Sequence, residues 1–340
     1  MKSKALVLLF LVTFSVKAQT PDHEGSLVKW MSLSEAMEKN KTQPKPIILD
    51  FFTDWCGWCK HMMKTTYADP NLAGYINNYF YPVKFDAEGK DTVEYLGQKY
   101  IPTSDKPRTP HPLAVKLLQN KLMYPTTLFL NGYDKIKNEF ALSMLASGYL
   151  ETKKIEPILI FTLENSYRNS NYDDFRVGYE QSFFDSTIDV RLEKLKWKTP
   201  AEIFIQNAQA GKKKLVFISA AWCNSCKVMK RSSFIDSLNI DYLNSKYDMI
   251  DFDATIKDTL YYKGLAMTNT GTNEMPFHSL VLSLCRGSLA MPSVVILNES
   301  NEVVDVIPFY LNARILNQVS HFYGDDVYKT KSWKEFAEGK

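Results

Sequence analysis

Two pairs of cysteines have the spacing that thiol–disulfide exchange requires. Cys56 and Cys59 lie in the segment Trp-Cys-Gly-Trp-Cys-Lys, and Cys223 and Cys226 lie in Trp-Cys-Asn-Ser-Cys-Lys, 167 residues further along. The reaction needs a thiolate that attacks a disulfide and a nearby thiol that resolves the mixed disulfide. Loops this short constrain an unfolded chain weakly, so a purely structural purpose is disfavoured. We therefore expect two redox-active disulfides, Cys56–Cys59 and Cys223–Cys226, and no other cofactor.

The first cysteine of each pair is the expected nucleophile. If each motif opens a helix, the free backbone N–H groups and the helix dipole stabilise a thiolate there and lower its pKa below about 8.5. Cys56 and Cys223 would then attack, while Cys59 and Cys226 would resolve. A zinc site or four buried structural cysteines remain the alternatives. Zinc needs four converging ligands, whereas the two pairs are far apart in the sequence, so we expect no metal.

The flanks of the two motifs show that one domain is repeated. A proline that opens an apolar segment follows 69 residues after the first cysteine of each pair, at Pro125 and at Pro292. With a shift of 167, many identical residues coincide without a gap between about residues 28 and 134, after which the shift changes by six. The predicted organisation is a leader at 1–18 and domains at 19–178 and 190–340. A polar stretch near 168–192, which contains scattered aromatic residues, joins the domains.

Strands and helices must alternate to position these motifs. In the first copy we expect a short strand around Trp30, and helices at 34–40, from the cysteine motif onward, at 111–118 and at 151–163. Nearly continuous apolar runs predict buried strands at 46–52 and 80–85. A further strand at 126–130, a turn at Asn131-Gly132 and a partner strand at 136–142 complete the pattern. This alternation indicates an α/β fold with a central mixed sheet flanked by helices.

The N-terminus and the charge balance bear on location. Lys2 and Lys4 precede an apolar run from Ala5 to Val16, and small residues lie around a cleavage point after Ala18. This pattern is typical of a secretory signal peptide, a buried N-terminal helix being the alternative. The predicted mature chain has equal numbers of acidic and basic residues, so nothing indicates binding to nucleic acid or to a membrane surface. No later run is long enough to span a bilayer. We expect a periplasmic or secreted protein.

The combined motifs resemble the thioredoxin-like superfamily over nearly the whole predicted mature chain. The tryptophan before each pair, the lysine after it and the downstream proline carry the resemblance. The run from Asp54 to Lys60, with Asp69-Pro70 and Phe85-Asp86-Ala87, is most similar to exported bacterial members such as the C-terminal domain of the disulfide reductase DsbD. The resemblance implies cis peptide bonds before Pro125 and Pro292. It also implies a substrate-binding surface made of these residues: Trp55, Trp58, Tyr124, Pro125, Trp222, Met291 and Pro292.

A carboxylate six residues before the first pair differs between the copies. Asp50 lies inside the apolar run Ile47 to Phe52, where an unpartnered charge is costly. In thioredoxins an aspartate at this position helps to deprotonate the resolving cysteine, so we expect the same of Asp50, with a polar strand-edge residue as the alternative. The second copy has Phe217 there. The first site is therefore expected to be the faster reductase.

Three further residues are expected to have structural roles. His111 and His278 recur 14 residues before the prolines, each at the start of an apolar helix. We expect them to cap or pack, rather than to act in the site or bind metal. Cys285 lies among apolar residues and is expected to be a buried small hydrophobic group.

The resulting expectation is an exported thiol–disulfide oxidoreductase that acts on disulfides of exported proteins. Neither motif contains a histidine between its cysteines, which favours a reducing role. A reductant must then be supplied, and the resemblance implies a membrane thiol-electron carrier. The alternatives are a disulfide oxidase or isomerase, and a binding or scaffold module in which the cysteines are incidental.

Overall fold

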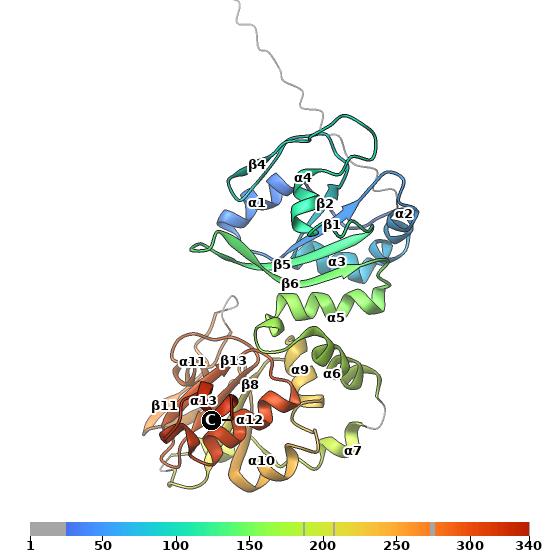
Figure 1. Ribbon diagram of the computed structural model, residues 1–340. Coiled ribbons are helices and arrows are strands. Elements are labelled where there is room, and N and C mark those ends of the chain that lie inside the picture. The colour runs from blue at the N-terminus through green and yellow to red at the C-terminus, as the bar shows by residue number, and fades with distance from the viewer. Residues whose placement is uncertain (1–24, 186–187, 207, 273–275, 340) are drawn as a thin grey trace, which may run out of the picture.

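The structure, a computed structural model, describes residues 25–185, 188–206, 208–272 and 276–339. The predicted leader, residues 1–18, lies outside these ranges. Two layered α/β units follow one another along the chain (Figure 1). Each has a central mixed sheet with helices on both faces, which confirms the predicted fold class.

The first unit is built from eleven helices and strands, counted among the described residues. They are α1 (Leu33–Thr42), β1 (Ile47–Phe52), α2 (Gly57–Lys64), α3 (Pro70–Tyr79), β2 (Tyr81–Asp86), β3 (Val93–Tyr95), β4 (Gln98–Tyr100), α4 (Pro112–Leu117), β5 (Thr126–Asp134), β6 (Glu139–Ser147) and α5 (Thr152–Leu163). Short polar side chains fix several helix starts. Ser32 caps α1 by accepting from the Glu35 N–H, and Asp69 caps α3, whose first residue is a proline.

The first sheet has the strand order β2-β1-β5-β6. Strand β1 is parallel to β2 and antiparallel to β5, and β6 is antiparallel to β5. Successive side chains of β1 alternate between the two faces. Ile47, Leu49 and Phe51 pack with α1 and α4, whereas Ile48 packs with α2, α3 and α5. Asp50 therefore belongs to the face that carries the cysteine helix α2.

The second unit repeats this plan and adds one strand. Its elements are β7 (Trp197–Lys198), α8 (Pro200–Ile203), β8 (Lys213–Ser219), α9 (Asn224–Arg231), α10 (Ile240–Lys246), β9 (Tyr247–Asp253), β10 (Leu260–Tyr262), β11 (Leu265–Met267), α11 (Ser279–Leu284), β12 (Ser293–Leu297), β13 (Val303–Pro308), α12 (Ala313–Gly324) and α13 (Trp333–Ala337). The sheet order is β13-β12-β8-β9-β7, with β8, β9 and β7 mutually parallel where they pair.

Two local predictions are wrong. The strand expected around Trp30 is only an isolated bridge between Met31 and Val83, whereas its second copy is the short strand β7. The turn expected at Asn131-Gly132 is absent, because β5 continues to Asp134 and pairs with β6 through two register shifts. A positive φ of 58° at Gly132 allows the strand to continue through this irregularity. The hairpin therefore turns after Asp134.

The described residues of the stretch between the units form two helices, α6 (Tyr172–Phe184) and α7 (Ile188–Leu192). The predicted boundary at residue 178 lies inside α6, and the domain limits remain a prediction. Helix α6 packs on α9, the cysteine helix of the second unit. The approach is close, because a Cβ added at Gly178 would lie 2.9 Å from both Ser232 Oγ and Tyr310 Oη.

Candidate functional site

The first cysteine pair lies at the N-terminus of α2. Cys56 is the N-cap residue, and its sulfur accepts a hydrogen bond from the Cys59 N–H at 3.1 Å. The two cysteines form a disulfide whose Cα atoms are 5.3 Å apart. Backbone N–H groups at a helix start stabilise negative charge, so a thiolate formed at Cys56 is favoured. The arrangement suits nucleophilic attack by Cys56.

Exposed aromatic side chains surround this disulfide. Trp55 and Trp58 are 55% and 62% exposed, although the cysteines beside them are buried. The Trp55 ring meets Tyr124 edge to face at a centroid distance of 6.1 Å. Trp58 and His61 both contact Tyr149, at 5.6 Å and 5.1 Å. Exposed rings of this kind form a surface that an apolar, extended peptide could cover.

Three residues of this surface, Glu88, Arg108 and Tyr149, were not predicted from the sequence. Glu88 accepts hydrogen bonds from Trp55 Nε1 at 3.1 Å, and the Arg108 guanidinium lies 5.6 Å from the Trp55 ring centre. Tyr149 and His61 complete the far side. These contacts join segments distant in sequence. The sequence offers one signal for them, because Tyr149-Leu150 is repeated as Tyr310-Leu311 in the second copy.

Both downstream prolines follow cis peptide bonds, Tyr124–Pro125 and Met291–Pro292, as the resemblance implies. Each proline directly precedes a central strand, β5 or β12. Met291 packs against the core cluster that contains Cys223 and Cys226. Tyr124 contacts Trp55 beside the first pair. The structure thus brings the predicted substrate-binding residues next to the two cysteine motifs.

Asp50 is a buried, partnered carboxylate rather than a strand-edge residue. Its Oδ2 atom is 2.7 Å from Lys84 Nζ, and its Oδ1 atom accepts a hydrogen bond from Thr127 Oγ1 at 2.8 Å. Lys84 is itself buried, and its ammonium lies 4.5 Å from the centre of the Phe52 ring. One cation and one hydroxyl thus hold the buried carboxylate in place.

The second unit moves the charges of this network to other elements. Phe217 replaces Asp50, and Asp251 of β9 stands where the first copy has Lys84. Asp251 forms an ion pair with Lys230 of the cysteine helix α9. Both side chains line a cavity of about 560 Å³ that also reaches Cys226. Lys84 and Asp251 occupy equivalent positions in the two copies, so the change of charge at this position could have been recognised from the sequence.

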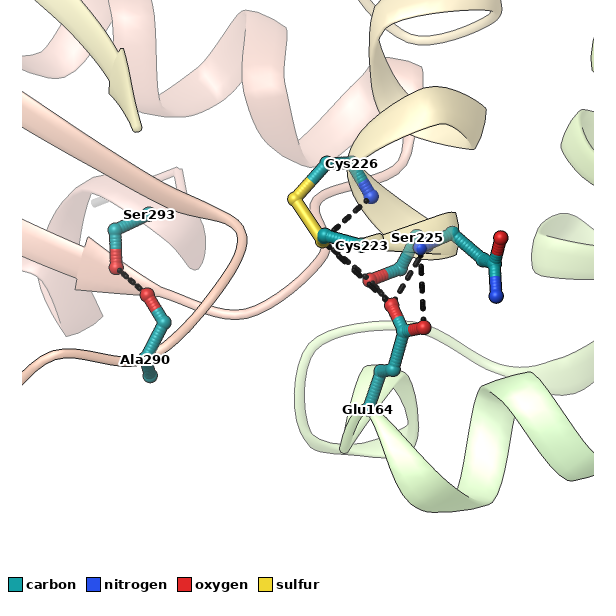
Figure 2. The surroundings of a disulfide bond; sticks show 7 residues. Glu164, Cys223, Ser225, Cys226, Ala290 and Ser293 are labelled. Carbon is teal, nitrogen blue, oxygen red and sulfur yellow. Dashed lines mark hydrogen bonds between the residues drawn. A yellow bond between two sulfur atoms is a disulfide. The ribbon is translucent and has the colours of Figure 1, made fainter. Parts of the chain in front are cut away.

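The second cysteine pair has the same local geometry but different surroundings. Cys223 caps α9, accepts a hydrogen bond from the Cys226 N–H at 3.1 Å and is disulfide-bonded to Cys226. Trp222 is 59% exposed, as Trp55 is in the first unit. Ser225, however, is completely buried, whereas its counterpart Trp58 is largely exposed. The carboxylate of Glu164, at the end of α5 in the first unit, lies on this motif (Figure 2).

Both histidines cap helices, as expected. His111 Nδ1 accepts from the Leu113 N–H at 3.1 Å, and its Nε2 lies 3.0 Å from the Asp91 carbonyl oxygen. His278 repeats the arrangement with Leu280 and Asp258. An Nδ1 acceptor with an Nε2 donor requires the neutral ring. Burial accordingly lowers the pKa of His111.

Cys285 is a buried free thiol whose pKa burial raises to about 11. It packs in the cluster of α8 and α11 on the face of the second sheet opposite α9. Among the residues that the structure describes, no three histidine, cysteine, aspartate or glutamate side chains gather as a metal site. Within the same residues, no helix is long and apolar enough to cross a membrane.

Sequence comparison places the first unit in a known group. Residues 18–154 match the Thioredox_DsbH family model, described as a protein of unknown function, DUF255. This first unit is thioredoxin-like. The chain resembles the thiol:disulfide interchange protein DsbD of Vibrio vulnificus strain CMCP6, with 34% identity over 64 residues, 18% of this chain and 11% of the relative. The DsbD of strain YJ016 is 35% identical over 68 residues, which are 19% of this chain and 11% of the relative.

Solved structures that resemble part of this chain have low sequence identities and low TM-scores. A DsbH oxidoreductase shares 20% identity and covers 38% of this chain and 83% of its own, with a TM-score of 0.25. The reduced DsbD C-terminal domain of Neisseria meningitidis shares 19% identity over 38% of this chain and 93% of its own, also with a TM-score of 0.25.

Proposed function

We propose that this thioredoxin-like chain is an exported thiol–disulfide oxidoreductase that reduces disulfides of exported proteins. One observation carries the proposal. Cys56, disulfide-bonded to Cys59, caps α2 with Trp55 and Trp58 exposed around it, and Tyr124, the residue before cis-Pro125, contacts Trp55. A buried sulfur at a helix start within an exposed aromatic surface suits reaction with a docked protein disulfide.

The proposed reaction proceeds in two exchanges. In the reduced enzyme, the Cys56 thiolate attacks one sulfur of the substrate disulfide, forming a mixed disulfide and releasing the other substrate sulfur as a thiolate. The Cys59 thiolate then attacks the Cys56 sulfur and releases the second substrate thiol. Two electrons pass to the substrate, two protons follow from solvent or from the site, and Cys56–Cys59 becomes a disulfide.

Asp50 is the proposed proton-holding group for this cycle. It lies on the α2 face of β1 and is held by Lys84 and Thr127. A proton from the Cys59 thiol can pass to it directly or through water while the second exchange occurs. Phe217 cannot do this in the second unit, where Asp251 is among the carboxylates of the cavity wall.

The cycle needs a reductant, for which we propose a dithiol carrier in the membrane. The chain spans about 11% of the curated DsbD relatives that it matches, so the carrier and the periplasmic or secreted location are proposals that rest on resemblance and on the predicted leader at 1–18. Export predicts a mature N-terminus at Gln19. Mass spectrometry of the protein from its native compartment checks this.

Insulin reduction by dithiothreitol tests the activity. The mature chain should accelerate the turbidity that appears as insulin chains separate. A variant with serine at Cys56, Cys59, Cys223 and Cys226 is the control and should give the rate of dithiothreitol alone. Equal rates for the two proteins would favour the scaffold alternative. Acceleration together with efficient rearrangement of a scrambled disulfide substrate would favour an isomerase.

A further inference from the structure

Glu164 of the first unit occupies the start of the cysteine helix in the second. Its Oε1 atom accepts from the Asn224 N–H at 3.1 Å, and its Oε2 atom accepts from the Ser225 N–H at 2.7 Å and from the Ser225 hydroxyl. Oε2 also lies 3.7 Å from Cys223 Sγ (Figure 2). A carboxylate supplied from another domain therefore uses the N–H groups that would otherwise favour a thiolate.

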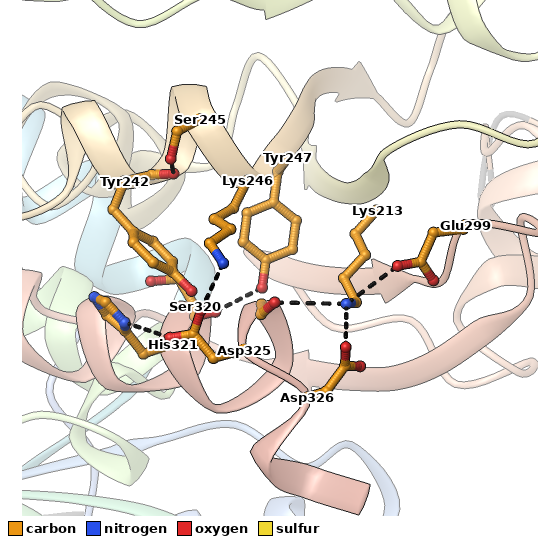
Figure 3. Close-up of polar contacts among 11 residues, drawn as sticks. Lys213, Tyr242, Ser245, Lys246, Tyr247, Glu299, Ser320, His321, Asp325 and Asp326 are labelled. Carbon is orange, nitrogen blue, oxygen red and sulfur yellow. Dashed lines mark hydrogen bonds and ion pairs between the residues drawn. The ribbon is translucent and has the colours of Figure 1, made fainter.

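Glu164 differs from its equivalent residue in the second copy in the unit that it contacts. The equivalent residue of the second copy is Asp325, which also ends its helix and precedes a residue with left-handed φ, Asp326 at 61° against Asn165 at 57°. Asp325 stays within its own unit, 2.8 Å from Lys246 Nζ and 2.9 Å from His321 Nδ1 (Figure 3). Glu164 instead reaches the neighbouring active motif.

We propose that Glu164 is a positioning residue for the second disulfide, and that its negative charge keeps Cys223 protonated when the pair is reduced. Like charges at this separation in a buried site repel, so a carboxylate beside the sulfur opposes ionisation of the thiol. Hydrogen bonds from two N–H groups and a hydroxyl hold the carboxylate there. The proposal rests on the proposed exchange function and deepens it.

Other charged and titratable groups also lie around the motif. Lys227, on α9, acts on Glu164 and favours its charged form, while Tyr75 of α3 faces Glu164 from the first unit. Burial raises the pKa of Glu164, and its hydrogen bonds oppose the rise. Two N–H groups and the Ser225 hydroxyl donate to its oxygens and favour the charged carboxylate. Glu164 is therefore charged when Cys223 would lose its proton.

Two consequences follow for the second pair. Its reduced form gains no stabilisation from a thiolate near neutral pH, so the disulfide is harder to reduce and the dithiol is the stronger electron donor. Its nucleophile is also attenuated while Glu164 lies on the motif. The first unit thus sets the reactivity of the second through a side chain rather than through its own disulfide.

The test measures the pKa of Cys223 in the reduced full-length mature chain carrying Cys56→Ser and Cys59→Ser. The rate of iodoacetamide alkylation is followed against pH, and mass spectrometry of the Cys223 peptide separates it from Cys226 and Cys285. Glu164→Gln should lower the pKa of Cys223 by about one unit, a tenfold change in its ionisation constant, and raise the alkylation rate at pH 7. Glu156→Gln, on the same helix, is the matched control and should leave the profile unchanged.

An unchanged Cys223 profile in Glu164→Gln would overturn the proposal, since the glutamate would then be only a helix cap. Slower alkylation would also overturn it, because Glu164 would then act as a base that removes the thiol proton. Glu164→Asp keeps the charge and serves if the glutamine variant does not fold. The pKa of Cys223 in Glu164→Asp should stay above the pKa of Cys223 in Glu164→Ala. Alkylation needs no turnover, so this test can fail while the insulin assay succeeds, and the reverse.

Discussion

Asp50 Oδ2 lies 2.7 Å from Lys84 Nζ, and both side chains are almost wholly buried between β1, β2 and the cysteine helix. A buried ion pair contributes little net stability, but removal of one partner leaves an uncompensated charge. Asp50→Asn should therefore destabilise the first unit by about 3 kcal/mol, measured by urea unfolding. It should also slow insulin reduction by at least about tenfold.

A double variant separates these two effects. Asp50→Leu with Lys84→Met removes both charges and should restore most of the stability. The exchange rate should stay low, because no group remains to hold the proton. Recovery of the rate along with the stability would show that Asp50 has only a structural part.

Much of this site followed from sequence pattern because it depends on neighbours along the chain. The disulfide spacing, the helix start at Cys56 and the burial of Asp50 are local properties of a strand–turn–helix segment. The cis bonds at Pro125 and Pro292 came from resemblance. Glu164 could not be predicted, since its contact with Cys223 depends on how two units pack and on a helix formed by a stretch that reads as a linker.

The two cysteine pairs should contribute unequally to insulin reduction. The first motif has an exposed aromatic surface and the buried Asp50, whereas Cys223 lies beside Glu164. Cys56→Ser should therefore remove most of the rate, and Cys223→Ser should remove less than half. The comparison uses initial rates at equal protein concentration. A larger loss in Cys223→Ser would contradict the assignment of the first pair as the principal site.

Gly178 offers a second route to the interface, one that leaves Glu164 intact. Because a Cβ there would lie 2.9 Å from Ser232 Oγ and Tyr310 Oη, Gly178→Val should push α6 away from α9. Alkylation of reduced Cys223 at pH 7 should then become several-fold faster, as in Glu164→Gln. An unaltered rate in a folded Gly178→Val protein would mean that the interface does not control Cys223.

His111 gives the fold a pH dependence. Burial lowers its pKa in the folded state below the unfolded value of about 6.5, so the unfolded chain binds a proton first as pH falls. Its contribution to stability is present above about pH 6.5 and is lost at lower pH. His111→Ala should lower the free energy of unfolding by about 1 kcal/mol at pH 7 through loss of the helix cap. It should also reduce the difference in the free energy of unfolding between pH 7 and pH 5. Urea unfolding at both values checks this. An equally steep change in the variant would assign the dependence to other groups.

Cys285 should be chemically silent in the native protein. Its thiol is buried and has a pKa of about 11, so little thiolate exists at pH 8. Iodoacetamide should leave it unmodified until the chain is unfolded, and Cys285→Ala should support insulin reduction at the wild-type rate. Rapid labelling of native Cys285 would contradict its placement in the core.

The reduction potential of each pair, titrated against glutathione in single-motif variants of the mature chain, tests the central claim most directly. Electron donation predicts values near that of thioredoxin, about −270 mV. The charge of Glu164 predicts that the second pair is no more oxidising than the first. Values between about −180 and −120 mV would contradict a reducing role and assign the chain to disulfide formation or isomerisation.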